Sequence, residues 1–253
     1  MANRGGRAGK KIRKIHKTKT FLIVTCLTLG TLVFFALPFF HIKTVNIIGA
    51  GYYTREQILS EMGLDNDLKG GDSIFYRTAS SMAKGLNALP YIREASIEKN
   101  YPDGLTVTVL ERSPRGYILD DKLGVYLCID EEGVVLDIKS EIDGNLPVIT
   151  GLRFSGYEAG KVLQAENTDA FDSMVKLAEL FKKYDITDVA MADVSDSEDI
   201  RLFIGNVEAY IGSIAGADYS VNWVRNCLAE LDPNIRGTLH AENSDNTILS
   251  LLQ

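Results

Sequence analysis

The sequence contains one run of twenty uncharged residues, which begins at Phe21 and ends at Phe40. At about 1.5 Å per residue, a helix of this length spans about 30 Å, the thickness of the hydrocarbon core of a bilayer. Thirteen of the twenty residues are Phe, Leu, Ile or Val, which favour insertion into a membrane. The run therefore predicts a transmembrane helix over residues 21–40.

The sequence before this run predicts its orientation. Residues 1–20 carry eight lysines and arginines and no acidic residue, and such a flank stays on the cytoplasmic side of a membrane. A cleaved signal peptide is the alternative, but its apolar part usually has about 7–15 residues and is followed by small residues at the cleavage site. Here the run is longer and ends in Pro-Phe-Phe-His. We expect residues 1–20 to form a cytoplasmic tail and the chain after His41 to lie outside the cell membrane.

The part of the chain after the apolar run is acidic. Residues 41–253 contain 19 basic and 34 acidic residues, a net charge of −15, and nucleic acid repels such a surface. The histidines His16, His41 and His240 have no cysteine, histidine or glutamate at the spacing of metal ligands. We therefore expect no nucleic-acid partner, no metal, no cofactor and no small-molecule substrate.

The pattern of residues 42–112 predicts a small α+β domain. A strand pattern over residues 42–48 is followed by Thr54 and Gln57, which fit a capping box at the start of a helix. A second amphipathic helix is predicted from about Ile74. The segment "IEKNYPDGLTVTVLERSPRG" then alternates apolar and polar residues around a Pro-Asp-Gly turn, which predicts a hairpin. The order strand, helix, helix, strand, strand favours two helices packed on one face of a small sheet.

Residues 114–241 predict a mostly antiparallel β domain with about two helices. Short segments such as "GYILD", "GVYLCID" and "GVVLDI" alternate apolar and polar residues, and "RGTLHAE" could form a closing strand. Residues 242–253 are expected to form a C-terminal tail. Cys128 falls in a strand pattern and Cys227 in a helix pattern, and their spacing leaves open whether they pair, although free thiols are favoured.

The order of these segments resembles the FtsQ/DivIB family of bacterial cell-division proteins. The resemblance covers roughly residues 20–240. It is carried by "VNIIGAGYYTREQIL", "LPYIREASIEKNYPDGLTVTVLERSPRG", "CIDEEGVVLD" and "LPVITG". It implies an α+β fold with a POTRA (polypeptide-transport-associated) domain over residues 41–113, in the order β-α-α-β-β, followed by the β domain over residues 114–241.

The resemblance also implies a function without chemistry. Members of this family are scaffolds of the division septum, bound to the single-span proteins FtsB (DivIC) and FtsL. An exposed strand edge can receive a strand of another chain through backbone hydrogen bonds. We therefore expect a partner strand to bind along the closing strand and its neighbour. The predicted partner-binding residues are Tyr210, Gly237, Thr238, Leu239, His240 and Ala241.

Two other functions remain as alternatives. Ser81 and Lys84 match the S-x-x-K pattern of penicillin-binding enzymes, in which a lysine activates a serine, and would suit an extracytoplasmic cell-wall hydrolase or transpeptidase. The companion motifs of those enzymes are missing from the sequence, which favours a solvated helix face. The second alternative is a membrane-tethered sensor that signals through the basic residues 1–20.

Overall fold

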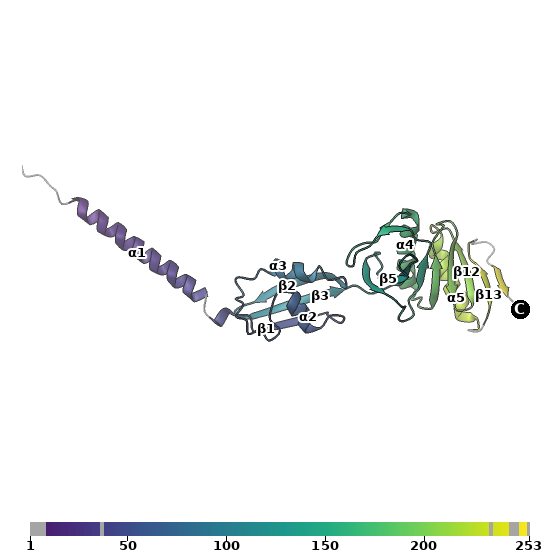
Figure 1. Ribbon diagram of the computed structural model, residues 1–253, viewed down its shortest axis with the longest axis horizontal. Helices are drawn as coiled ribbons and strands as arrows, with labels where there is room; N and C mark the ends of the chain where they lie inside the picture. Colours follow the sequence, from purple (N-terminus) through teal and green to yellow (C-terminus); the bar gives the residue numbers. More distant parts are fainter. Residues whose placement is uncertain (1–8, 36–37, 233–234, 243–247, 252–253) are drawn as a thin grey trace, which may run out of the picture. The chain divides into compact units, whose positions relative to one another are not determined.

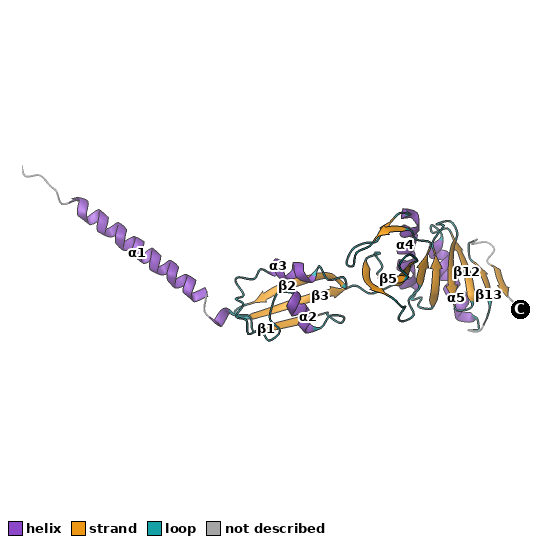
Figure 2. Cartoon of the chain, in the orientation of Figure 1, coloured by secondary structure: helices purple, strands orange, loops and turns teal. Residues whose placement is uncertain are grey.

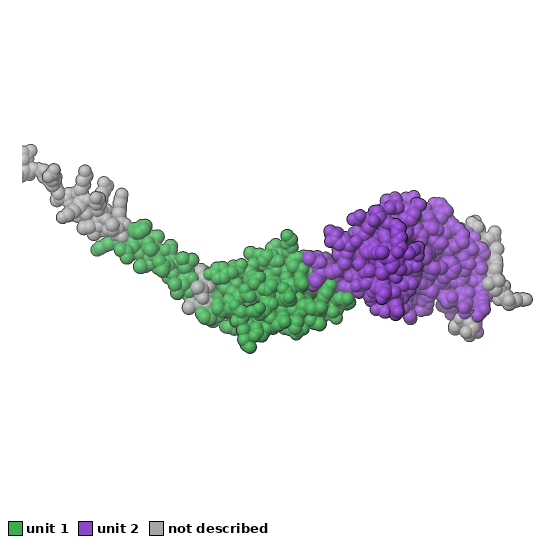
Figure 3. Space-filling view, in the orientation of Figure 1, with its two compact units in different colours: residues 1–86, 94–109 green, residues 87–93, 110–253 purple. Residues whose placement is uncertain are grey.

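The computed structural model describes residues 9–35, 38–232, 235–242 and 248–251. It divides into two compact units, drawn in separate colours in Figure 3: Met1–Leu86 with Glu94–Val109, and Asn87–Arg93 with Leu110–Gln253. Both units combine helices with a sheet (Figure 2), so the predicted α+β class is confirmed. The domain bounds proposed from the sequence, 41–113 and 114–241, stay a prediction.

The N-terminal segment is helical. Helix α1 spans Gly9–Phe35 and a 3-10 helix, η1, spans Pro38–Phe40. The predicted membrane span runs across residues 36–37, which lie outside the described residues. Within the described part of the chain, none of the helices combines the length and the apolar character needed to cross a bilayer.

The first unit has the element order that the sequence predicts. Its sheet has the strand order β1-β3-β2, and β1 runs parallel to β3. The core comes from the inner positions of the strands and from the apolar faces of the helices, where Ile58, Met82 and Val107 are almost fully buried. The elements are β1 (Thr44–Ile48), α2 (Arg55–Glu61), α3 (Ala79–Leu86), β2 (Ile92–Asn100) and β3 (Gly104–Glu111).

Helix α2 begins at the capping residue that the sequence predicts, whereas helix α3 begins later than predicted. At α2 the predicted capping box is confirmed: the Gln57 amide donates to Thr54 Oγ1 at 3.3 Å, and the Thr54 amide donates to Gln57 Oε1 at 2.8 Å. The predicted start of the next helix at Ile74 is wrong, because Ile74 uses its backbone elsewhere. Its amide donates to the Phe40 carbonyl at 2.9 Å and its carbonyl accepts from Lys99 Nζ at 2.5 Å. Helix α3 starts only at Ala79.

The second unit is built on one nine-stranded sheet, with the order β14-β13-β12-β11-β10-β7-β4-β5-β6. Figure 1 labels β5, β12 and β13 of this sheet. Three neighbouring pairs are parallel (β12 with β13, β10 with β7, β4 with β7) and the other pairs are antiparallel. The predicted antiparallel character therefore holds for most of a mixed sheet. The strands are β4 (Gly116–Asp120), β5 (Val125–Ile129), β6 (Val135–Lys139), β7 (Val148–Thr150), β10 (Val189–Asp193), β11 (Ile200–Ile204), β12 (Val207–Gly212), β13 (Gly237–His240) and β14 (Ile248–Leu251).

Four strands were not predicted. One of them is β10, in the middle of the large sheet. β8 (Phe154–Gly156) and β9 (Gln164–Ala165) form a separate two-stranded sheet. β14 lies within residues 242–253, which the sequence assigned to a tail. It pairs with β13 and becomes the last strand of the large sheet.

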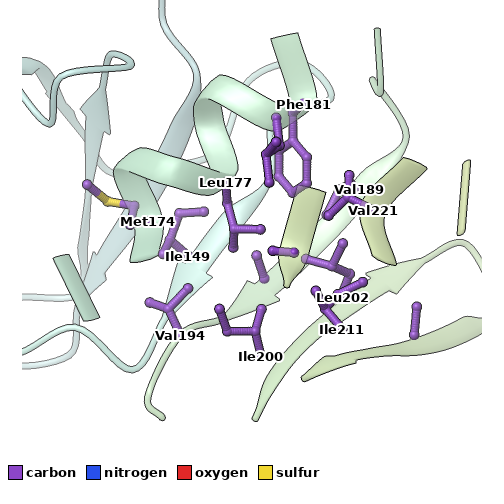
Figure 4. Packing of buried hydrophobic residues seen from close by; sticks show 14 of the residues in the cluster. Ile149, Met174, Leu177, Phe181, Val189, Val194, Ile200, Leu202, Ile211 and Val221 are labelled. Carbon is purple, nitrogen blue, oxygen red and sulfur yellow. The ribbon is translucent and has the colours of Figure 1, made fainter. Parts of the chain in front are cut away.

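Two helices cover one face of the large sheet. In α4 (Thr168–Tyr184), side chains three or four positions apart face the strands, and in α5 (Ala217–Glu230) the buried Val221 and Val224 do the same. Figure 4 shows side chains of both helices converging on the alternate, inward-facing positions of the strands. The residues labelled there are Ile149, Met174, Leu177, Phe181, Val189, Val194, Ile200, Leu202, Ile211 and Val221. The opposite face of β11, β12 and β13 is therefore free to carry polar and aromatic side chains.

The three cysteines are free thiols. Cys26 is exposed on α1, Cys128 is buried in β5, and Cys227 is half-buried in α5. Burial raises the pKa of the Cys128 thiol to about 11, so this group stays protonated and unreactive at neutral pH. The spacing of Cys128 and Cys227 left open whether they pair, and in the fold they do not form a disulfide.

Candidate protein-binding site

The residues predicted to bind a partner lie together at the end of the large sheet. β13 runs parallel to β12, with Tyr210 opposite His240 and Ala209 opposite Leu239. The Ala241 amide donates to the Tyr210 carbonyl at 2.9 Å and extends the pairing beyond the last residue of β13. The predicted neighbour relation between Tyr210 and the closing strand is thus found in the fold.

Two contacts fix β13 to the core. The Leu239 side chain is fully buried among the apolar residues beneath the sheet. The hydroxyl of Ser220, on α5, donates to the Ala241 carbonyl at 2.8 Å, and Ser220 is itself buried. Because both a core side chain and a helix hold it, β13 is a rigid part of the sheet.

The register determines which backbone groups of β13 point away from β12. In a parallel pair, one residue bonds to the two residues that flank its partner on the next strand. The bond from the Ala241 amide to Tyr210 therefore places Ala241 and Leu239 on the side of β12. Backbone groups alternate along a strand, so the N–H and C=O of Thr238 and His240 point to the outer side. These four groups form what we call the outer edge of β13.

Beside the outer edge, aromatic and charged side chains form a row across three strands. The Tyr210 and His240 rings stack with centroids 4.9 Å apart and an angle of 14° between their planes. The Arg201 guanidinium, on β11, lies 4.8 Å from the centre of the Tyr210 ring. His240 Nδ1 is 3.0 Å from Glu242 Oε1. The row Arg201–Tyr210–His240 gives this end of the sheet a half-exposed surface that suits protein contacts.

The acid–base properties of the row follow from its packing. Desolvation raises the pKa of the Tyr210 hydroxyl, and the nearby carboxylate of Glu208 raises it further. A hydrogen bond to the Asp199 carboxylate raises the pKa of Arg201. At neutral pH the tyrosine is therefore neutral and the arginine charged, so this surface offers a neutral hydroxyl and a fixed cation.

Sequence reasoning missed Arg201 and the strand β14 as parts of this site. The alternation in "IRLFI" and "VEAYI" contains the signal for Arg201, because a hairpin register places it opposite Tyr210. The signal for β14 is the apolar segment "ILSLL" near the C-terminus. In the structure β14 pairs with the outer edge of β13 that the sequence predicted to be exposed.

The residues of the enzymatic alternative have a local structural role. Ser81 lies on the exposed first turn of α3, where its hydroxyl donates to the Thr78 carbonyl at 3.0 Å and its amide donates to Thr78 Oγ1 at 3.1 Å. Lys84 lies in the last turn of the same short helix. Among the described residues, no group of three or more histidine, cysteine or acidic side chains is arranged to hold a metal ion.

Comparisons with known proteins agree with the resemblance seen in the sequence. Residues 40–112 match the POTRA domain, FtsQ-type. The cell division protein DivIB of Clostridium tetani is 26% identical over 205 residues, covering 80% of this chain and 75% of the relative. That of Clostridium botulinum strain Hall is 27% identical over 223 residues, covering 87% and 82%. The cell division protein FtsQ of Anaeromyxobacter sp. strain K is 27% identical over 135 residues, covering 53% and 44%. Over most of its length, the chain is therefore similar to the cell-division proteins of the FtsQ/DivIB family.

Proposed function

We propose that this cell-division protein is a non-enzymatic scaffold that binds FtsB/DivIC-like and FtsL-like proteins at the division septum. The observation that carries the proposal is the outer edge of β13, whose backbone groups at Thr238 and His240 are aligned for strand pairing and pair with β14 in this structure. Leu239 and Ser220 hold this edge in place, so a partner strand that takes the place of β14 meets a preformed template. The row at Arg201 and Tyr210 adds side-chain contacts beside it.

The enzymatic alternative is less well supported. In an S-x-x-K enzyme the serine hydroxyl must be free to attack, whereas the Ser81 hydroxyl donates to the Thr78 carbonyl within its own helix turn. Modification of Ser81 by a β-lactam probe would favour the hydrolase. The sensor alternative, which needs a specific basic tail, requires function to be lost when residues 1–20 are replaced by an unrelated basic sequence.

A membrane anchor is the second part of the proposal. Phe21 is 73% exposed and Leu32 71% exposed on α1, so these apolar side chains need a cover. The hydroxyls of two threonines also find hydrogen-bond acceptors within the helix. Thr25 Oγ1 donates to the Phe21 carbonyl at 2.9 Å, and Thr31 Oγ1 donates to the Leu27 carbonyl at 2.6 Å. These features support a single cell-membrane span over residues 21–40, with residues 1–20 in the cytoplasm and the remainder outside.

The anchor is tested by extraction of membranes. We expect the full chain to stay in the membrane pellet at alkaline pH and to be released only by detergent, because about twenty apolar residues are inserted. A variant without residues 21–40 should appear in the soluble fraction. Recovery of the intact chain in the alkaline supernatant, or of a mature chain trimmed of residues 1–40, would contradict the anchor.

The partner-binding edge is tested at Thr238. A proline there removes an N–H that points to the outer edge but leaves the bonds between β12 and β13 intact. We expect Thr238→Pro to weaken binding of a DivIC-like partner by about tenfold or more when the variant and its parent both lack residues 243–253, because β14 then does not compete for the same N–H. Affinity is measured by co-purification and titration of these chains in detergent.

Thr238→Val is the matched control, because it keeps the backbone N–H and the branched side chain. It should bind the partner within about twofold of the unmodified chain. Fluorescence of Trp223, which lies on α5 beneath the same end of the sheet, reports whether each variant is folded. A folded Thr238→Pro chain that binds both partners normally would refute this assignment of the site.

A further inference from the structure

We infer that β14 is an intramolecular placeholder on the partner-binding edge, and that a partner strand must displace it. This inference rests on the proposed function, because it concerns occupation of the same edge. β14 is the strand drawn in yellow beyond β13 in Figure 1. It runs antiparallel to β13 in the register Gly237↔Leu251, Thr238↔Ser250, Leu239↔Leu249 and His240↔Ile248.

The two pairings compete for the same backbone groups. In an antiparallel pair, residues whose N–H and C=O groups face each other exchange two hydrogen bonds. The outer edge of β13 therefore engages Ser250 through Thr238 and Ile248 through His240. A partner strand added to β13 needs these same groups. Since each N–H donates to one acceptor, β14 and a partner strand exclude one another.

Of the two strands, β14 is the one that can leave. β13 is held by the buried Leu239 and by the bond from Ser220 to Ala241, and it also pairs with β12. β14 is four residues long and, among the strands that the structure describes, pairs with β13 alone. For so short a strand, the gain from its hydrogen bonds and the entropy lost by ordering it are of similar size. Its dissociation therefore needs little free energy.

The short connection nevertheless makes β14 an effective competitor. Only residues 243–247 separate Glu242 from Ile248 in the sequence. A segment tethered so closely has an effective concentration of about millimolar at its site. Weak, unrelated strands are then excluded from the edge, while a partner with high affinity for β13 still replaces β14. The placeholder thus caps an edge that would otherwise invite aggregation.

A reversible lock tests the displacement. Cysteines introduced together at Thr238 and Ser250, which are direct partners in the register, should form a disulfide that holds β14 on β13. We expect the oxidised chain to bind a DivIC-like partner at least about tenfold more weakly than the reduced chain. The reason is that the fraction of molecules with β14 detached from β13 falls below about a tenth of its value in the reduced chain. A cysteine pair at Phe203 and Glu208, which face each other on β11 and β12, is the control. Its oxidation should leave binding unchanged.

The outcomes separate this inference from the proposed function. If the oxidised lock binds the partner as well as the reduced form does, β14 is no obstacle and the inference is wrong, while the scaffold stands. Failure of the Thr238 and Ser250 cysteines to cross-link in the free chain also overturns it. If the reduced lock and the unmodified chain both fail to bind the partner, the proposed function itself fails.

Hydrogen exchange gives a test that needs no partner. Removing residues 243–253 should speed amide exchange at Thr238 and His240, whose N–H groups face β14, by about tenfold or more. Exchange at Leu239 and Ala241 should change little, because these amides face β12. The truncated chain should also bind the partner more tightly than the full chain. Equal protection at Thr238 and His240 with and without the tail would refute the placeholder.

Discussion

Replacing Gly151 with alanine is expected to lower the free energy of unfolding of the second unit by about 3 kcal/mol. Gly151 follows β7 with a φ of +88°, a conformation that side chains with a Cβ avoid. An added Cβ would lie 2.3 Å from the Ser195 amide nitrogen and 2.5 Å from the Ser195 Cα. Both are backbone atoms after the neighbouring strand β10, so the clash cannot be relieved by moving a side chain.

Gly144 provides a matched control for this effect. It lies in the same unit with a φ of +82°, but an added Cβ would meet nothing within 4 Å. Gly144→Ala should therefore show only the conformational part of the loss, about 1 kcal/mol. Urea unfolding of the full chain, followed through the fluorescence of Trp223 in α5, measures both variants in the same unit. Equal losses at Gly151 and Gly144 would show that the approach to Ser195 does not matter.

Replacing Arg112 with methionine is the second large change, with an expected loss of about 3 kcal/mol. Arg112 Nη1 lies 2.6 Å from Asp130 Oδ2 and 2.6 Å from Glu132 Oε2. The Asp130 side chain is only 3% exposed, and its other oxygen accepts the amides of Glu132 and Val134, each at 2.9 Å. Without Arg112, a buried carboxylate that shapes the turn between β5 and β6 has no cation beside it.

Arg93 is the control for Arg112 because it pairs with the same acidic segment. Its side chain is 42% exposed, and it contacts Glu131 and Glu132 at the surface. Arg93→Met should cost less than about 1 kcal/mol, since exposed ion pairs contribute little. Adding Asp130→Asn to Arg112→Met should recover part of the loss, because the amide oxygen still accepts hydrogen bonds while the charge is gone. No recovery would mean that Arg112 acts through packing rather than charge.

Much of the fold follows from local patterns that survive in the structure. The capping box at Thr54 starts α2, and the Pro-Asp-Gly turn joins β2 to β3 as the alternation predicts. The wrong start at Ile74 has a tertiary cause: the Ile74 amide donates to Phe40, and Lys99 donates to the Ile74 carbonyl, which in a helix would accept a bond from the next turn. Local periodicity carries no information about such bonds.

The candidate site was predicted in part. The closing strand and its neighbour at Tyr210 were predicted because the strand patterns of "VEAYIG" and "RGTLHAE" are visible in the sequence. The stack of Tyr210 on His240 and the position of Arg201 depend on the registers of three strands. A shift of one residue in any of them would turn these side chains to the other face.

By itself, the sequence determined the α+β class, the order of elements in the first unit and the resemblance to the FtsQ/DivIB family, because these depend on residue spacing along the chain. Only the tertiary structure decided that β12 and β13 run parallel, that the large sheet is mixed, and that β14 covers the outer edge of β13. The physical reason is that strand pairing joins backbone groups, which every residue carries alike. Which strand finds which edge is therefore decided by the packing of the whole unit and not by any one segment.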